Sequence, residues 1–301
     1  MSGAPNSNQQ SRSLRWLSLF PIHIVLVLLA IIWIMPSIGL LITSFRPQRE
    51  IASSGWWNLQ NVADNITSQN YEMVLTNRPT ADQPPLPDPN FFHTFLNSLI
   101  ITIPSTIMPI MFAALAAYAF SWLDFTGRNF LYLLIILLLI VPLQVTWVPM
   151  LKIFNPLGLT RSYFGIWIAH TAYGTPFAVF LLRNFFAELP RDLFDSARVD
   201  GASELTIFSR IALPLSTPAL ASLGIFQFVW VWNDLVNGKI YISDPDKIPL
   251  TRGIERLLLQ FGGQWHILSA ASFISLLVPL LIFFSLQRYF VRGITAGAVK
   301  G

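Results

Sequence analysis

The side chains best suited to chemistry are gathered in one segment, residues 183–214. Its charged residues are Arg183, Glu188, Arg191, Asp192, Asp195, Arg198, Asp200, Glu204 and Arg210. Helical spacing puts Leu193, Phe194 and Ala197 on one face, Gly201 interrupts it, and a second face of Leu205, Phe208, Ile211 and Ala212 ends at Pro214. The segment is therefore predicted to be two short amphipathic helices joined by a bend. A helix lying on lipid favours Lys and Arg, so five acids among nine charges favour docking to another protein.

Nothing in the sequence predicts catalysis. Zero cysteines exclude thiolate nucleophiles and cysteine-bound metals. No Gly-x4-Gly-Lys-Ser/Thr loop is present, so the chain cannot hold nucleotide phosphates in the P-loop manner. The expected membrane spans contain no Ser/His, His-Glu-x-x-His or paired-acid constellation, and His23 and His170 are their only histidines or charged residues. We expect a non-catalytic chain that binds no cofactor or metal.

These residues must be positioned by helices that cross a membrane. Hydrophobic residues make up 53% of the chain and charged residues 11%, whereas soluble proteins carry about 25% charged residues. Crossing a bilayer takes roughly 20 apolar residues, and six charge-free stretches are long enough: 16–45, 89–123, 129–151, 162–182, 211–233 and 257–287. Runs such as 131–141 lack the alternation of barrel strands. The prediction is an all-α polytopic membrane protein with spans at Leu19–Thr43, Thr94–Phe120, Phe130–Met150, Gly165–Leu182, Leu215–Trp232 and Leu268–Leu286.

Six spans divide the chain into an N-terminal tail (1–18), a transmembrane domain (19–286) and a C-terminal tail (287–301). Both tails and loop 183–214 then lie on one side, and loops 46–91 and 235–267 lie on the other. Five prolines between Pro79 and Pro89 predict an extended, irregular second half for loop 46–91. Ten Lys and Arg on the side of the termini against nine on the far side leave the orientation open. The net charge of +4 comes without a basic cluster, so nucleic acid is not an expected partner.

Every expected span contains or adjoins a proline. Proline removes a backbone hydrogen bond, which neighbouring helices or a water-lined cavity can replace but lipid cannot. Two interpretations follow with equal weight. Either the helices are kinked around a transport cavity, or proline is simply more common in membrane helices.

The charged segment resembles the coupling loop of permease subunits of binding-protein-dependent ABC importers. The family pattern is Glu-Ala-Ala, three residues, Gly, nine residues, Ile-x-Leu-Pro. This chain has Asp195, Ser196 and Ala197, then Gly201, and then Ile211, Leu213 and Pro214 at the same spacing. The stretch Trp232–Leu235 and the ending 287–301 are similar to the carbohydrate branch of that family, whose maltose-type members include MalG-like subunits.

This resemblance implies the ABC type I importer permease fold, a multi-pass protein of the bacterial inner membrane, and both termini in the cytoplasm. It also implies a second permease subunit, two ATPase subunits that carry ATP and Mg, and a periplasmic or lipoprotein solute-binding protein. The solute would be a sugar, oligosaccharide, glycoside or polyol. The implied ATPase-coupling residues are Asp195, Ser196, Ala197, Asp200, Gly201, Phe208, Ile211, Leu213 and Pro214, and the tail residues that reach the ATPases are Gly297, Val299 and Lys300. Contacts to the binding protein are expected from Gln260, Gly262, Gly263 and Trp265.

A sugar path needs polar and aromatic groups that face the centre of the bundle. The candidates are Gln144, Trp147, His170, Tyr173, Gln227 and Asn233. Each also has an interpretation as a packing or interfacial residue, which is the more common role of an aromatic side chain in a span, and the second permease subunit could supply the sugar contacts instead. An ion-coupled secondary transporter would need charged groups within its spans. A structural subunit of another membrane complex fits the composition but leaves the coupling pattern unexplained.

Overall fold

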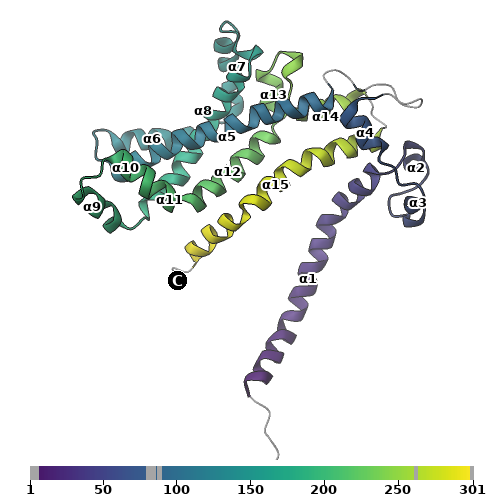
Figure 1. The fold of residues 1–301 in the computed structure, drawn as a ribbon, viewed down its shortest axis with the longest axis horizontal. Helices are drawn as coiled ribbons and strands as arrows, with labels where there is room; N and C mark the ends of the chain where they lie inside the picture. The colour runs from purple at the N-terminus through teal and green to yellow at the C-terminus, as the bar shows by residue number, and fades with distance from the viewer. Residues whose placement is uncertain (1–6, 79–85, 87–89, 261–263, 299–301) are drawn as a thin grey trace, which may run out of the picture. The chain divides into compact units, whose positions relative to one another are not determined.

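A computed structural model describes residues 7–78, 86, 90–260 and 264–298 (Figure 1). Within these ranges every regular element is a helix. Four helical stretches are long and apolar enough to cross a membrane: Phe20–Ser44 in α1 (Ser7–Ser44), α5 (Phe91–Trp122), α8 (Tyr163–Ala187) and Trp265–Arg288 in α15 (Trp265–Ala298). Two bent helix pairs pass the same test only when each pair is taken together. The all-α membrane fold is confirmed, and a count of six spans requires each bent pair to be one span.

The first bent pair interrupts the helix that was expected to run through the span Phe130–Met150. It consists of α6 (Arg128–Leu138) and α7 (Leu143–Phe154), which meet at an angle of 99°. The end of α6 tightens, because the amides of Leu139 and Ile140 donate to carbonyls three residues back. Pro142 follows with an extended ψ of 128° and has no N–H to continue the helix. The break therefore follows from local backbone chemistry that a count of apolar residues does not detect.

The second bent pair corrects the expectation that Pro214 ends a helix. Here α10 (Glu204–Ile207), a π-helical turn (Phe208–Ala212) and α11 (Leu213–Leu215) follow one another without interruption, with Pro214 inside. The chain bends by 74° only at Ser216, before α12 (Thr217–Trp232) begins with Pro218 in its first turn. Proline is tolerated at the start of a helical segment, where its missing N–H is not needed. The bend therefore lies two residues beyond the predicted end.

Most other span prolines lie inside continuous helices: Pro21 and Pro36 in α1, Pro104 and Pro109 in α5, Pro176 in α8 and Pro279 in α15. Both sharp bends adjoin a proline, Pro142 or Pro218. Proline content alone therefore does not locate the bends.

The chain separates into two compact units, and the first comprises residues 1–72 and 263–273. After α1 it contains α2 (Gln48–Ser53), α3 (Leu59–Asp64) and the start of α4 (Gln69–Thr76). Arg46 is buried here, and its Nη2 donates to the carbonyls of Glu50 (2.7 Å) and Ser54 (2.9 Å). The Asn70 amide donates to the Ser44 and Arg46 carbonyls. The guanidinium of Arg46 is therefore stabilised by carbonyl oxygens, and these hydrogen bonds fix the fold of the segment after α1.

The second unit comprises residues 73–262 and 274–301. Its centre is the packing of α5 against α8, which lie side by side (Figure 1), with α12 against α5. Small side chains on both helices let them approach closely, and the buried ones include Ala113 and Ala117 on α5 and Ala178 on α8.

At the start of α5, the segment after α12 is tied to the core by hydrogen bonds. This segment contains α13 (Val236–Tyr241), a short 3-10 turn (Pro245–Lys247) and α14 (Leu250–Gln260). The Asn97 amide donates to the carbonyls of Asp246 (2.7 Å) and Ile248 (3.0 Å), and the Leu250 amide donates to the Ser98 hydroxyl (2.7 Å). Residues 236–250 are thus an ordered cap on α5.

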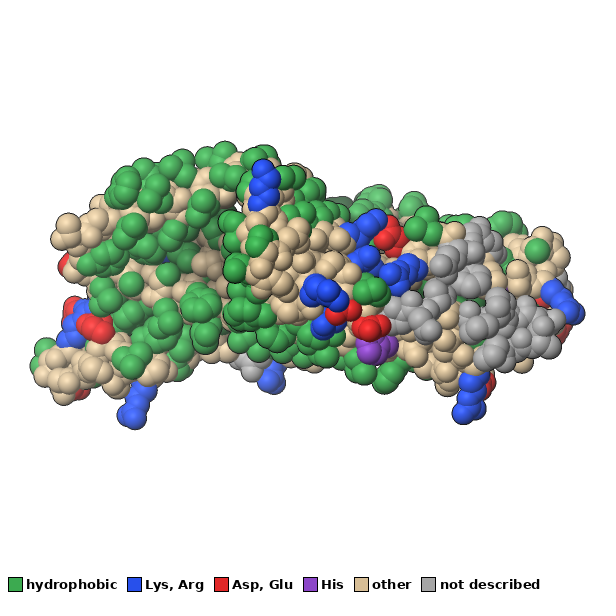
Figure 2. Space-filling view, turned by 90° about the horizontal axis from the view of Figure 1, so that it is seen from above, with side chains coloured by type: hydrophobic (Ala, Val, Ile, Leu, Met, Phe, Trp, Pro, Cys, Tyr) green, Lys and Arg blue, Asp and Glu red, His purple; other side chains and the backbone are tan. Residues whose placement is uncertain are grey.

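The surface of the helices is mostly apolar. Hydrophobic side chains cover much of the face in Figure 2, and charged side chains take up a smaller part of it. Large exposed side chains run along α5 and α6, for example Ile107, Met111, Leu133 and Leu138. Exposed apolar area of this extent is expected on a surface that contacts lipid or partner helices.

Candidate functional site

The charged segment folds as a bent helical unit, residues 191–215, which we call the elbow. Its first arm is α9 (Arg191–Val199), which begins after Pro190. Gly201 ends this arm with a φ of +81°. The Gly201 amide donates to the Arg198 carbonyl and the Ala202 amide donates to the Ala197 carbonyl, both at 3.0 Å. These are the two bonds of a Schellman motif, so glycine is required here by backbone conformation.

The second arm begins at Ser203, whose hydroxyl accepts from the Thr206 amide at 3.3 Å and caps α10. The π-helical turn Phe208–Ala212 then brings Ile207 and Ala212, five positions apart, into the same core. A π turn spaces its hydrogen bonds by five residues. The predicted α-helical face was therefore wrong in part, since Leu205 is 70% exposed whereas Ile207 is fully buried.

The inner face of the elbow packs on the end of α5. Phe194 is fully buried, and its ring stacks on Trp122 with centroids 3.8 Å apart and planes 7° apart. Phe208 packs edge-on against Tyr118 at 5.2 Å. Aromatic pairs of this geometry contribute roughly 0.5–1.5 kcal/mol beyond the burial of apolar area. The elbow is thereby attached to the end of α5.

Polar contacts join the two arms to the same helix end. Arg198 Nε donates to Glu204 at 2.9 Å, and the Tyr118 hydroxyl donates to the other Glu204 oxygen at 2.6 Å. Arg198 also donates to the Trp122 carbonyl at 3.3 Å. The hydrogen bond to Glu204 raises the pKa of Arg198 above its ordinary value. Both arms therefore move with α5 as long as these contacts persist.

The outer face of the elbow is exposed and mixes charged with apolar side chains. Val199 is 87% exposed, Leu205 70% and Leu193 46%. Between them lie exposed acids, including Asp192, Asp195 and Asp200. Large apolar side chains among charges are typical of a surface that another protein covers.

The predicted coupling residues fall into three groups by their exposure in the structure. Asp195, Ser196, Asp200, Gly201 and Pro214 are exposed, while Ala197, Ile211 and Leu213 are half-buried. Phe208 is buried in the core and is therefore an internal residue rather than a surface contact. Sequence reasoning missed Val199 and Leu205 as exposed apolar residues, and it missed the tie of Arg198 and Glu204 to Tyr118. The six-residue spacing of this ion pair across Gly201 could have indicated that the arms fold back on each other.

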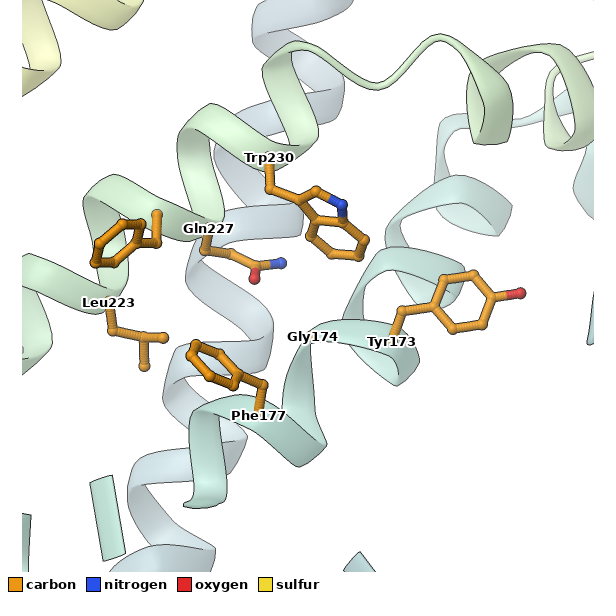
Figure 3. A pocket seen from close by; sticks show the side chains of 7 residues that line it. Tyr173, Gly174, Phe177, Leu223, Gln227 and Trp230 are labelled. Carbon is orange, nitrogen blue, oxygen red and sulfur yellow. The ribbon is translucent and has the colours of Figure 1, made fainter. Parts of the chain in front are cut away.

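A cavity of about 380 Å³ lies between α8 and α12 and is lined by Tyr173, Gly174, Phe177, Leu223, Phe226, Gln227 and Trp230. Figure 3 shows the Gln227 side chain directed from α12 into the space toward α8. The Gln227 amide donates to the Ser105 carbonyl of α5 at 3.2 Å. The Tyr173 hydroxyl points away from the cavity (Figure 3) and lies 2.6 Å from that of Tyr241 and 2.8 Å from that of Thr146. The cavity thus offers aromatic rings and an amide, and no charged side chain.

The structure brings together two of the six predicted path residues, Tyr173 and Gln227. His170 is buried one helical turn from Tyr173, 5.3 Å edge-on from Trp230 and 3.6 Å from a carboxylate oxygen of Asp234. Trp147 packs against the core cluster that contains Phe154 and Tyr241, and Tyr173 and Trp230 pack against the same cluster. Gln144 is exposed, and Asn233 is exposed with its amide donating to the Val229 carbonyl. The prediction missed Trp230, Phe177 and Phe226.

The other predicted contact residues are described only in part. Gln260 and Gly297 are described as positions in α14 and α15, whereas Gly262, Gly263, Val299 and Lys300 lie outside the described residues. Trp265 begins α15 and is 51% exposed. In the described ranges no group of three or more His, Cys, Asp or Glu side chains could hold a metal ion.

Comparisons with known proteins agree with this architecture. Residues 109–296 match the family described as binding-protein-dependent transport system inner membrane component. The chain is 45% identical to the osmoprotective compounds uptake permease protein GgtD of Synechocystis sp., over 98% of this chain and 96% of the relative. It is 38% identical to the alpha-glucoside transport system permease protein AglG of Rhizobium meliloti, over 93% and 97% respectively. A solved bacterial ABC transporter involved in the import of the acidic polysaccharide alginate has the same fold, with a TM-score of 0.62, 18% identity and coverage of 95% and 99%.

Proposed function

The chain belongs to the family of binding-protein-dependent transport system inner membrane components, and we propose that it is a permease subunit of an ABC importer for a neutral sugar, glycoside or polyol. In this proposal it works with a second permease chain, two ATPase subunits and a solute-binding protein. ATP and Mg are bound by the ATPase subunits, since the sequence has no P-loop. The termini and the elbow face the cytoplasm.

The outer face of the elbow is the proposed docking site for an ATPase subunit. The single observation that carries this proposal is the contrast between its two faces. The inner face is stacked and hydrogen-bonded to α5, whereas the outer face exposes Leu193, Val199 and Leu205 among acids. Such an element transmits force because a partner can hold one side while the other side stays attached to a membrane helix.

Helix α5 is the proposed route of transmission. It has 32 residues and is about 48 Å long, enough to cross a bilayer. Tyr118 and Trp122 at its end hold the elbow, and Asn97 and Ser98 near its start hold the cap formed by residues 236–250. Closure of the ATPases would therefore move the cap on the opposite side of the membrane. The cap and Trp265 belong to the loop that is proposed to contact the binding protein. Such a transition is a shift between two states that a partner's ligand biases.

The cavity between α8 and α12 is the proposed solute contact of this chain. Sugar rings pack well on aromatic faces, and Gln227 offers an amide for hydroxyl groups. A lining without charged side chains suits a neutral solute. The name of one relative, the alpha-glucoside transport system permease protein AglG, supports the same solute class. In the proposal the tail residues Gly297, Val299 and Lys300 reach the ATPase subunits.

The proposal is tested in proteoliposomes that hold both permease chains and the ATPases, with the binding protein outside. Uptake of a radiolabelled neutral disaccharide or glycoside should require ATP inside the vesicles and the binding protein. Vesicles with this chain alone should neither hydrolyse ATP nor accumulate solute. Uptake by this chain alone, driven by an ion gradient, would replace the proposal with the ion-coupled alternative.

A further inference from the structure

A second cleft, of about 390 Å³, lies where α5 and α8 end and α9 begins. Its walls include Trp122 at the end of α5, Asp124 after it, Arg128 at the start of α6, Arg183 near the end of α8, and Arg191 and Arg198 on α9. The same lining contains a second acid, Asp195, so four guanidinium groups face two carboxylates. The cleft is therefore a concave, positively charged site at the ends of membrane helices.

Only two of the four arginines have a carboxylate partner in the part of the chain that the structure describes. Arg128 pairs with Asp124 at 2.9 Å, and Arg198 pairs with Glu204 at 2.9 Å and with Asp195 at 3.4 Å. Arg183 and Arg191 pair with no described acid. The unmatched positive charge in the cleft is thus that of Arg183 and Arg191.

Of the two arginines without a described carboxylate partner, Arg183 has the less satisfied guanidinium group. Its guanidinium lies over the ring of Tyr132, 4.9 Å from the centroid, and its Nε is buried without a hydrogen-bond partner. A buried donor without a partner costs roughly 1–3 kcal/mol, and more when the group is charged. An acceptor with several oxygens placed in the cleft would satisfy this guanidinium and that of Arg191 together.

We propose that this cleft binds the phosphate group of an anionic phospholipid from the leaflet on the side of the elbow. Arginine forms paired hydrogen bonds to phosphate oxygens, and basic pockets between membrane helices recognise anionic headgroups. The surroundings favour a lipid over free phosphate, because α6 leaves the cleft at Arg128 and exposes Phe130, Leu133 and Leu134. Acyl chains can lie along this helix while the headgroup occupies the cleft.

The test measures lipid retained by the assembled transporter, purified with phosphatidylglycerol and phosphatidylcholine in equal amounts and analysed by native mass spectrometry. The wild type should retain phosphatidylglycerol in preference. R183Q and R191Q should each lower that preference about fivefold. R210Q removes the same charge from an exposed elbow position outside the cleft and should leave the preference unchanged. The double variant R183K/R191K keeps the charge but not the paired hydrogen bonds, so it should retain more of the preference than R183Q/R191Q and less than the wild type, which separates lost binding from lost folding.

A preference for phosphatidylglycerol that is equal in the wild type and in R183Q/R191Q would overturn the proposal. If inorganic phosphate displaced phosphatidylglycerol from the wild type at low concentration, the lipid source would be overturned in favour of free phosphate. Resistance to inorganic phosphate supports the lipid. None of these outcomes depends on which solute is transported.

Discussion

Replacing Gly201 by alanine adds a side chain to a residue whose φ is +81°. The amide of Gly201 donates the hydrogen bond to the Arg198 carbonyl that ends α9. No atom lies within 4 Å of the added Cβ, so the cost is conformational and not steric. Left-handed backbone costs an alanine about 1–2 kcal/mol, which lowers the population of the native bend about 5- to 30-fold. Asparagine adopts this conformation more readily and should cost less. Proline has a φ near −65° and no N–H, so Gly201→Pro removes both the bend and the hydrogen bond.

The assay is solute uptake, together with ATPase activity stimulated by the loaded binding protein, in proteoliposomes with equal amounts of transporter. Uptake should fall in the order wild type, Gly201→Asn, Gly201→Ala, Gly201→Pro. The proline variant should show almost none although its spans still insert. Gly158→Ala is the matched control, because Gly158 has a φ of +67°, also has no atom within 4 Å of a Cβ, and lies outside the elbow. Normal uptake by Gly201→Pro, or an equal loss in Gly158→Ala, would refute the role given to the bend.

Three further changes test the inner face of the elbow and the cavity. Phe194→Ala removes the ring stacked on Trp122 and should lower the stability of the elbow by about 3–5 kcal/mol. Proteolysis within 191–215 should therefore accelerate, whereas Leu193→Ala, at the exposed neighbouring residue, should leave the rate unchanged. Tyr118→Phe deletes the hydrogen bond to Glu204 and should weaken protection of the α10 amides by about 1.5–3 kcal/mol in hydrogen exchange; unchanged protection would show that this bond does not hold the elbow. Gly174→Ala places a Cβ 2.6 Å from the Gln227 amide nitrogen and should raise the KM for solute, whereas Gly224→Ala on α12, whose Cβ meets only Ile110 at 3.9 Å, should not. An unchanged KM in Gly174→Ala would exclude the cavity from the solute path.

Much of the fold could be predicted from the sequence, because a helix that crosses a bilayer must have a minimum length and few charged residues, and both can be read from the sequence. The helix breaks could not be placed in this way. Pro142 breaks a span while Pro104 and Pro176 do not, and the difference depends on whether neighbouring groups replace the missing hydrogen bond. Burial is also a tertiary property, so sequence alone did not show that Arg46 would be held by carbonyls.

The candidate site was predictable in outline only. The spacing from Asp195 through Gly201 to Pro214 located the elbow. The positive φ of Gly201 explains why a glycine stands at the bend. The inner and outer faces of the second arm were not predictable, since the π turn at Phe208–Ala212 changes the period on which the prediction relied. Pairs that meet only in the folded chain, such as Trp122 with Phe194 or Tyr118 with Glu204, leave no local signal.

The central claim is that an ATPase subunit holds the outer face of the elbow, and single cysteines test it directly because the chain has none of its own. Val199→Cys replaces an elbow side chain that is 87% exposed, and Leu259→Cys replaces one on α14 that is 75% exposed. With a short crosslinker in the assembled, transport-active complex, Val199→Cys should be joined to the ATPase subunit and Leu259→Cys should not. A crosslink to the ATPase from Leu259→Cys but not from Val199→Cys would contradict the account.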